Sequence, residues 1–168
     1  MSDPATFELK PIGVIHTPFK VQKGTPIQPV YAEKAEGTVE VYEPYRASLA
    51  DLDGFERIWL VYWFDRAKAY QPKVVPYRDT VPRGLFATRA PCRPNPIGLS
   101  PVRLFSVDVP RGILRVASLD ILDGTPLLDI KPYVPLFESF PSAAAGWIDR
   151  LAVEREKADR RFEEDWDT

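Results

Sequence analysis

Proline is the residue that most constrains how this chain can fold, and it is concentrated between residues 84 and 101, where the sequence reads GLFATRAPCRPNPIGLSP. Each of the four prolines in this stretch fixes φ at about −65° and pushes the residue before it towards an extended conformation. A helix is therefore excluded here. The prolines also remove four backbone donors, so side chains must satisfy the remaining carbonyl groups. We call residues 84–101 the proline segment.

The polar residues of the proline segment suggest a receptor for an anion. In an extended chain, Arg89, Arg93 and Asn95 have the same parity, which predicts that their side chains point to one side. Two guanidinium groups and one amide on a stiff backbone would form a preorganised site for a carboxylate or a phosphate. The alternative is that Arg89 or Asn95 merely ties down carbonyl groups of its own loop.

Two single residues are candidates for reactivity. Cys92 lies close to two arginines, which would lower the pKa of its thiol, but it has no evident base nearby and is predicted to be a small filler. His16 ends a predicted strand, where it would be either a base or, as is commoner, a structural histidine. One cysteine and one histidine cannot form an intrachain disulfide or the usual Cys/His zinc site. We therefore expect chemistry without such a metal.

The charge of the chain is unevenly distributed. The formal net charge is −2, but residues 73–103 alone have a net charge of +5. A local basic segment on an acidic protein favours a site for carboxylate or phosphate over nonspecific coating of nucleic acid, which needs a basic surface overall. The alternative is that these arginines are scattered over a solvated loop.

The length and composition indicate one domain. A chain of 168 residues with 45% hydrophobic content can bury one substantial core. No apolar run approaches the ~20 residues of a membrane span, and the N-terminal sequence lacks the pattern of a secretory signal. We therefore expect a cytoplasmic protein. The glycine-rich motifs of nucleotide-binding enzymes, the GxSxG elbow and the HExxH motif are absent from the sequence, which disfavours a Rossmann-type enzyme.

Most of the pattern is typical of short strands. Residues 37–44 alternate apolar and polar side chains, and the unbroken apolar run IWLVYWF at 58–64 predicts a central strand that is covered on both faces. Further strands are predicted at 10–17, 84–88, 102–109, 112–119 and 127–131. Short strands with close turns predict a mainly β fold, either an antiparallel barrel or a sandwich.

Helix is predicted in two places. Residues 45–54 have a helical composition and end at Gly54. Residues 142–165 are rich in helix formers, and an apolar stripe at helical spacing predicts that they pack on the domain or on a partner subunit. The stripe consists of Trp147, Leu151, Ala158, Phe162 and Trp166. Residues 66–83, with three prolines, are predicted to be a long surface loop of the kind that is often functional.

The proline segment resembles the signature of the TrmO/TsaA-like family, which is approximately GxF[AS]TR[AS]xxRPNPIG. Three other segments agree with that family in order and spacing: PIGVIHTPF at 11–19, GFERIWLVYWF at 54–64 and LDILDGTPLLDIKPYVP at 119–135. The resemblance covers residues 8–138. It implies a small, closed or nearly closed antiparallel β-barrel at 1–140, followed by a C-terminal helical extension at 141–168.

The resemblance also implies an activity. Members of the family bind S-adenosylmethionine, form homodimers with the cofactor near the subunit interface, and in bacteria methylate N6 of N6-threonylcarbamoyladenosine at position 37 of tRNA. The bacterial enzymes have a further C-terminal domain and often His-Gln where this chain has Asp65-Arg66. We expect these departures to affect the RNA substrate more than the cofactor. A methyltransferase for a small molecule and a noncatalytic binding module remain alternatives.

Carried onto this chain, the family's cofactor contacts are Pro29, Val30, Tyr31, Asp65, Arg66, Arg89, Leu99, Asp123, Gly124, Thr125, Pro126 and Leu127. Arg93 and Asn95 belong to the same signature and would shape the pocket. Arg89 or Arg66 would anchor the methionine carboxylate of the cofactor. The acceptor nitrogen must lose a proton, so we expect a carboxylate base, with Asp65, Asp120 and Asp129 as candidates.

Overall fold

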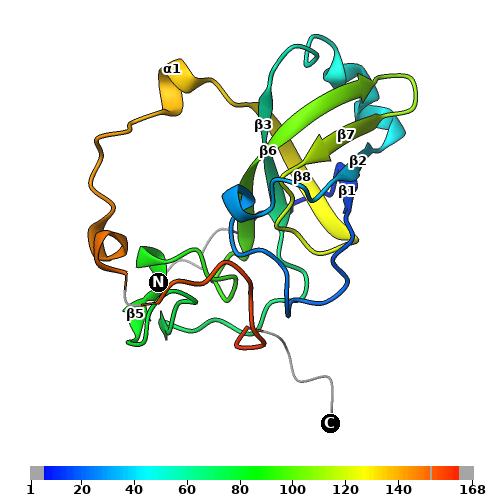
Figure 1. Ribbon diagram of the computed structural model, residues 1–168. Helices are drawn as coiled ribbons and strands as arrows, with labels where there is room; N and C mark the ends of the chain where they lie inside the picture. Colours follow the sequence, from blue (N-terminus) through cyan, green and yellow to red (C-terminus); the bar gives the residue numbers. More distant parts are fainter. Residues whose placement is uncertain (1–5, 152, 163–168) are drawn as a thin grey trace.

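The computed structural model describes residues 6–151 and 153–162, and six of its strands close into an antiparallel barrel (Figure 1). Around the barrel the strands follow the order β1-β2-β7-β6-β3-β8. Their bounds are Gly13–His16 for β1, Gly37–Val41 for β2, Arg57–Trp63 for β3, Ile97–Asp108 for β6, Ile113–Ala117 for β7 and Thr125–Pro132 for β8. The expected mainly β barrel is confirmed.

The remaining elements are short. Strands β4, Lys73–Val74, and β5, Arg83–Gly84, pair only with each other. The helical elements are the 3-10 turns η1 at Pro29–Tyr31, η2 at Glu43–Leu49, η3 at Leu85–Ala87 and η4 at Gly146–Arg150, and the α-helix α1 at Pro135–Glu138. Within the described residues, no helix is long and apolar enough to cross a membrane.

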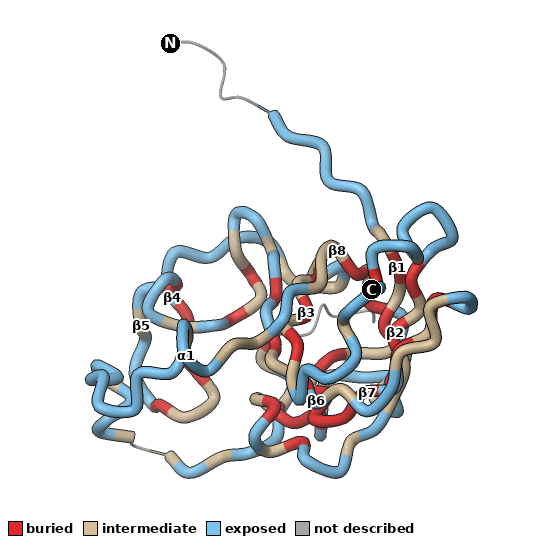
Figure 2. The backbone as a smooth tube through the Cα atoms, turned by 90° about the horizontal axis from the view of Figure 1, so that it is seen from above, coloured by how far each residue is buried: buried red, intermediate tan, exposed pale blue. Residues whose placement is uncertain are grey.

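The barrel interior is filled by alternate residues of its strands, and Figure 2 shows the buried segments gathered there. On β3, Ile58, Leu60 and Tyr62 point inwards and are buried, whereas the residues between them are half-buried. Each fully buried aliphatic side chain contributes about 1.5–3 kcal/mol. The expectation that β3 is covered on both faces is therefore only partly correct. On its outer face Trp59 donates to Glu138 of α1 over 2.6 Å.

The predicted strand at 84–88 is wrong beyond Gly84, because residues 85–87 form the 3-10 turn η3. The hydroxyl of Thr88 donates to the carbonyl oxygen of Leu85 over 2.8 Å and holds this turn. The predicted helix at 45–54 is also a 3-10 turn, η2, which begins two residues earlier and ends at Leu49. Asp51, at a φ of 62°, turns the chain away from a helical path.

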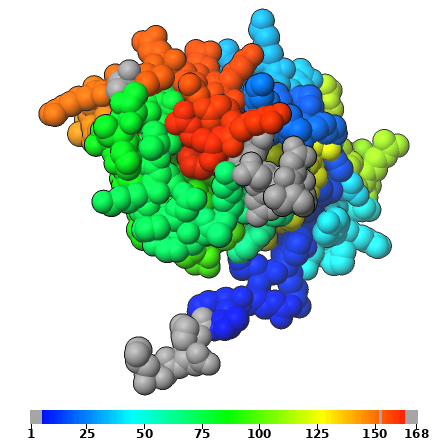
Figure 3. All heavy atoms as spheres, turned by 90° about the horizontal axis from the view of Figure 1, so that it is seen from below, coloured from blue at the N-terminus to red at the C-terminus, as the bar shows by residue number. Residues whose placement is uncertain are grey.

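The predicted C-terminal helix at 142–165 is wrong in the described part of the chain. Only η4 is helical there; Lys157 forms an isolated antiparallel bridge with Pro26, and residues 160–162 turn. Figure 3 shows the end of the described chain, in red, lying against the green central part of the sequence. The amide of Ala158 donates to the carbonyl oxygen of Thr25 over 2.7 Å, and the amide of Ile27 donates to Glu156 over 2.9 Å. These bonds replace the intrahelical ones, so tertiary contacts override local helix propensity.

The predicted packing of the C-terminal stripe on its own domain is confirmed for two residues, Ala158 and Phe162, which are buried. Phe162 joins a second apolar cluster with Val74, Leu85 and Cys92, and its ring meets Tyr77 edge-on at 5.1 Å. Trp166 of the predicted stripe lies outside the described residues.

Gly98 is required by the contact between β3 and β6. It lies opposite Tyr62 in the ladder, and a Cβ atom placed on it would come within 2.1 Å of the tyrosine ring. That ring is buried and its hydroxyl is hydrogen-bonded to Ser100, so displacing it costs free energy.

We predict that Gly98→Ala lowers the free energy of unfolding by about 2 kcal/mol or more, because the added methyl group overpacks the core. Gly84→Ala is the matched control: Gly84 has a φ of −55° and no neighbouring atom within 4 Å of a built Cβ. Urea denaturation of both variants measures the difference. Equal stabilities would contradict the proposed packing.

We also predict that Phe162→Ala detaches residues 153–162 locally, because burial of this ring holds the segment. The exchange rates of the Ala158 and Ile27 amide protons, measured by NMR, should rise at least about tenfold. Phe140→Ala serves as the control, since Phe140 is 72% exposed. Unchanged exchange in Phe162→Ala would show that other contacts hold the segment.

Candidate functional site

A cavity of about 340 Å³ opens at the end of the barrel where β3 ends and where β6 and β8 begin. We call it the barrel-end pocket. Its wall comes from residues within 22–28, 62–67, 88–93, 97–99 and 120–122, together with Tyr77 and Thr125. Ala158 and Phe162 of the C-terminal segment complete it. Residues far apart in sequence therefore share one site.

A chain of hydrogen bonds leads from the core into the barrel-end pocket. The hydroxyl of Ser100 donates to Oδ1 of Asp120 over 2.7 Å, and the Tyr62 hydroxyl lies 3.0 Å from the Ser100 oxygen. Because the single proton of Ser100 goes to Asp120, Tyr62 must donate to Ser100. Burial raises the pKa of Tyr62, which keeps this hydroxyl protonated.

Asp120 is a half-buried acid whose carboxyl group accepts a hydrogen bond from Ser100. Burial raises the pKa of Asp120 to about 6, while the hydrogen bond from Ser100 and the charge of Arg89 act in the opposite direction. Its carboxyl group changes protonation state near neutral pH. A group with such a pKa is suited to accept a proton during a reaction.

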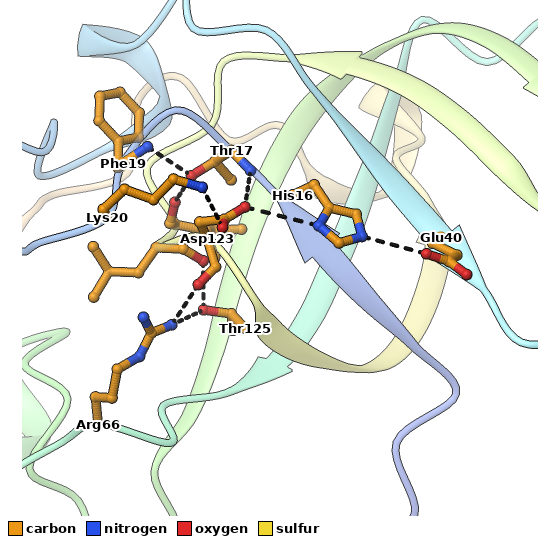
Figure 4. Close-up of polar contacts among 10 residues, drawn as sticks. His16, Thr17, Phe19, Lys20, Glu40, Arg66, Asp123 and Thr125 are labelled. Atoms are coloured by element: carbon orange, nitrogen blue, oxygen red, sulfur yellow. Dashed lines mark hydrogen bonds and ion pairs between the residues drawn. The ribbon is translucent and has the colours of Figure 1, made fainter.

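Arg66 is directed at the turn before β8, as Figure 4 shows. One of its terminal nitrogens donates to the carbonyl oxygen of Asp123 over 3.0 Å and to the Thr125 hydroxyl over 3.1 Å. Its Nε lies 3.3 Å from Oδ1 of Asp65. Arg66 therefore joins the end of β3 to this turn, and most of its donors are already used.

The side chain of Asp123 faces the end of β1 (Figure 4). It accepts from the amide of Thr17 over 3.0 Å and from Lys20, and these bonds lower the pKa of Asp123. Oδ1 of Asp123 also lies 3.8 Å from Nδ1 of His16, whose Nε2 lies 3.3 Å from Glu40. His16 thus bridges two acids on the surface, which supports the structural interpretation of this histidine.

The two arginines of the proline segment make different contacts, although both line the barrel-end pocket, and their joint role as an anion receptor stays a prediction. Arg93 donates to the carbonyl oxygens of Leu85, Thr88 and Ala90 over 3.4, 2.9 and 3.3 Å, which supplies donors that the prolines lack. The loop-tying role suggested for Arg89 or Asn95 thus belongs to Arg93. Arg89 donates to Gln28 over 3.0 Å and lines the pocket.

Cys92 is buried in the second apolar cluster, as expected of a filler. Burial raises the pKa of its thiol and outweighs the neighbouring cations, so the suggested lowering by arginine is wrong. Asn95 is exposed, and its backbone carbonyl accepts from the amide of Ile97 over 2.8 Å. Among the described residues, no group of three or more His, Cys, Asp or Glu gathers as metal ligands would.

The structure brings part of the expected cofactor set together. Asp65, Arg66, Arg89, Leu99 and Thr125 line the barrel-end pocket, as does Arg93. Seven others lie outside its lining: Pro29, Val30, Tyr31, Asp123, Gly124, Pro126 and Leu127. Leu127 points into the barrel core and is fully buried. Of the base candidates, Asp65 and Asp120 line the pocket, whereas Asp129 lies outside it and pairs with Lys131 over 2.8 Å.

Sequence reasoning missed four residues of this site: Tyr62, Ser100, Gln28 and Phe162. Ser100 could have been identified from the sequence pattern, because it is a polar residue between Gly98 and Val102 on the inward face of β6. The other three offer no such signal, since only the fold brings them to the pocket.

Comparison with known proteins identifies relatives of this chain. The family model of the tRNA-methyltransferase O N-terminal domain matches residues 14–139. A probable S-adenosyl-L-methionine-binding protein of Pyrococcus abyssi is 50% identical over 155 residues, covering 91% of this chain and 83% of that protein. The tRNA (adenine(37)-N6)-methyltransferase of Escherichia coli is 38% identical over 151 residues, covering 85% of this chain and 64% of that enzyme.

Solved structures share the fold as well. The crystal structure of TrmO from Pseudomonas aeruginosa superposes with a TM-score of 0.71 at 38% identity, covering 84% of this chain. The present chain spans 62% of that solved chain. Because the family model matches most of the sequence and several relatives exceed 30% identity, the chain belongs to the tRNA-methyltransferase O (TrmO) family.

Proposed function

We propose that this protein is an S-adenosylmethionine-dependent methyltransferase that acts on N6 of N6-threonylcarbamoyladenosine at position 37 of tRNA. The observation that carries the proposal is the Asp120 carboxyl group, which Ser100 holds in a pocket that also presents Arg89. The names of the relatives support the cofactor and the tRNA adenine, and the family resemblance supports the threonylcarbamoyl group.

The residues of the barrel-end pocket fit such a cofactor chemically. Arg89 uses one nitrogen on Gln28, so its other donors are suited to hold the methionine carboxylate. Phe64, Ile97 and Leu99 offer apolar wall, and Asp65 offers acceptor oxygens. When bound, the cofactor supplies a methyl group activated by a cationic sulfur. Methyl transfer is an in-line displacement, so the pocket's main contributions are positioning and exclusion of water.

The reaction requires one proton acceptor. The bound cofactor would supply the methyl group to the lone pair of the acceptor nitrogen, and its sulfur would be left as a neutral thioether. The N–H proton of the acceptor passes to the carboxylate of Asp120. The hydrogen bond from Ser100 orients this carboxylate during the transfer.

Asp120 is a better candidate for the base than the other two acids. Asp65 is exposed and already pairs with Arg66, whose Nε lies 3.3 Å from its Oδ1. Asp129 lies outside the pocket and pairs with Lys131. Asp120 combines a place in the pocket with a raised pKa.

We predict that wild-type protein transfers labelled methyl from S-adenosylmethionine to tRNA that carries the threonylcarbamoyl group but lacks the methyl group. In Asp120→Asn the rate constant should fall at least about 100-fold, because the base is lost, with cofactor affinity unchanged by calorimetry. Asp129→Asn is the control and should retain the wild-type rate. Turnover that is insensitive to tRNA would indicate a small-molecule acceptor, and cofactor binding without any transfer would indicate a binding module.

The pH dependence of the single-turnover rate should follow the ionisation of the Asp120 carboxyl group. The carboxylate is the active form, so the rate rises with pH up to about 6 and is constant above it. Ser100→Ala removes a hydrogen bond that lowers the pKa of Asp120, so the inflection should move to higher pH. The residual rate of Asp120→Asn should be flat over the same range. A wild-type profile without an inflection near pH 6 would rule out this assignment.

A further inference from the structure

A second cavity, of about 590 Å³, adjoins the barrel-end pocket. We call it the side pocket. Residues that line both cavities include Gln28, Thr88, Arg89 and Phe162, so the two share a wall. The rest of its lining comes from η1, from the loop around Tyr77, from η3 and from η4.

The side pocket is rich in aromatic rings and has two arginines. Its rings and cations are Tyr31, Tyr77, Phe86, Trp147, Phe162, Arg78 and Arg89. Such a combination suits a flat aromatic group that is attached to an anionic backbone. It is less suited to an aliphatic ligand, which would gain nothing from the guanidinium groups.

Phe86 is the most open of these rings. It is 78% exposed, and the Arg93 guanidinium lies 5.5 Å from its centroid. Arg93 is in turn fixed by the carbonyl groups of the proline segment. An aromatic ring that a guanidinium group holds on one side, and that is otherwise exposed, can stack on a flat ligand.

Other rings of the side pocket are also held in place. Trp147 donates from Nε1 to the carbonyl oxygen of Ala87 over 2.8 Å, and Arg83 lies 5.3 Å from the tryptophan ring centroid. Arg78 hydrogen-bonds the hydroxyl of Tyr31 and lies 5.6 Å from that ring's centroid. The rings of the side pocket are thus ordered by contacts within the protein, which reduces the entropy lost on binding.

We propose that the side pocket binds an unstacked nucleobase of an RNA loop, with Phe86 as its stacking surface. This proposal rests on the proposed function. In-line transfer requires the methyl donor and the accepting base to lie next to each other, and two pockets that share a wall allow this. Single-stranded bases are commonly recognised by aromatic stacking beside cationic groups that contact the phosphates.

The test uses Phe86→Ala in the full chain. The probe is a fluorescein-labelled anticodon stem-loop RNA that contains N6-threonylcarbamoyladenosine, with its dissociation constant measured by anisotropy at one fixed salt concentration. We expect binding about tenfold weaker than that of wild type, while the dissociation constant for S-adenosylmethionine, measured by calorimetry, is unchanged. Phe86→Trp should restore the affinity for RNA.

Phe105→Ala is a matched control. Phe105 is a 44% exposed ring on β6, and Arg103 lies 5.5 Å from its centroid, the same distance as Arg93 from Phe86. It lies outside the linings of both cavities, so its loss should leave affinity for RNA unchanged.

Two results would overturn the inference: equal RNA affinity in Phe86→Ala and wild type, or a loss of cofactor affinity in Phe86→Ala, which would assign the side pocket to the cofactor. Failure of the proposed function has a different signature. In that case wild-type protein would not methylate the tRNA, whereas a tenfold loss of RNA binding in Phe86→Ala would still support the side pocket.

Discussion

The contact between Tyr62 and Gly98 links the stability of the barrel to the geometry of the site. The tyrosine ring lies against a residue without a side chain, and this places its hydroxyl beside Ser100, two residues further along β6. Ser100 can then donate to Asp120, which follows β7 in the chain. The position of the pocket acid therefore depends on packing inside the core, and a small shift between β3 and β6 would be transmitted to Asp120.

The C-terminal segment gives the site a second dependence on packing. Its residues pair with the loop at 24–27 and place Phe162 in the cluster beneath the proline segment. Arg161 adds hydrogen bonds to the carbonyl oxygens of Val75 and Pro76, over 3.1 and 2.8 Å. Ala158 and Phe162 then form part of the pocket wall. This segment consequently contributes to the pocket wall, although it lies beyond the residues that the family model matches.

The sequence predicted most barrel strands because alternation between apolar and polar side chains is a local property, as on β2 and β7. The prediction of a C-terminal helix failed because the structure of this segment is not set locally. Residues 153–162 have helical composition, but their backbone hydrogen-bond partners lie more than a hundred positions away in the sequence. The same distinction holds within the site. The proline segment is recognisable as a pattern, whereas the roles of Arg89 and Arg93 depend on which carbonyl groups each can reach.

In the folded protein, most arginines of the basic segment at 73–103 contact groups of the protein itself. Arg83 pairs with the buried Asp79 over 2.6 Å and lowers the pKa of that acid, while Arg93 is directed at backbone carbonyl groups. Arg78 is engaged with Tyr31. Much of the +5 charge of residues 73–103 therefore serves to hold the segment together, while Arg89 and Arg93 also line the barrel-end pocket. Because this pocket is lined by both arginines and acids, it selects its ligand by shape and by the position of each charge as well as by overall attraction.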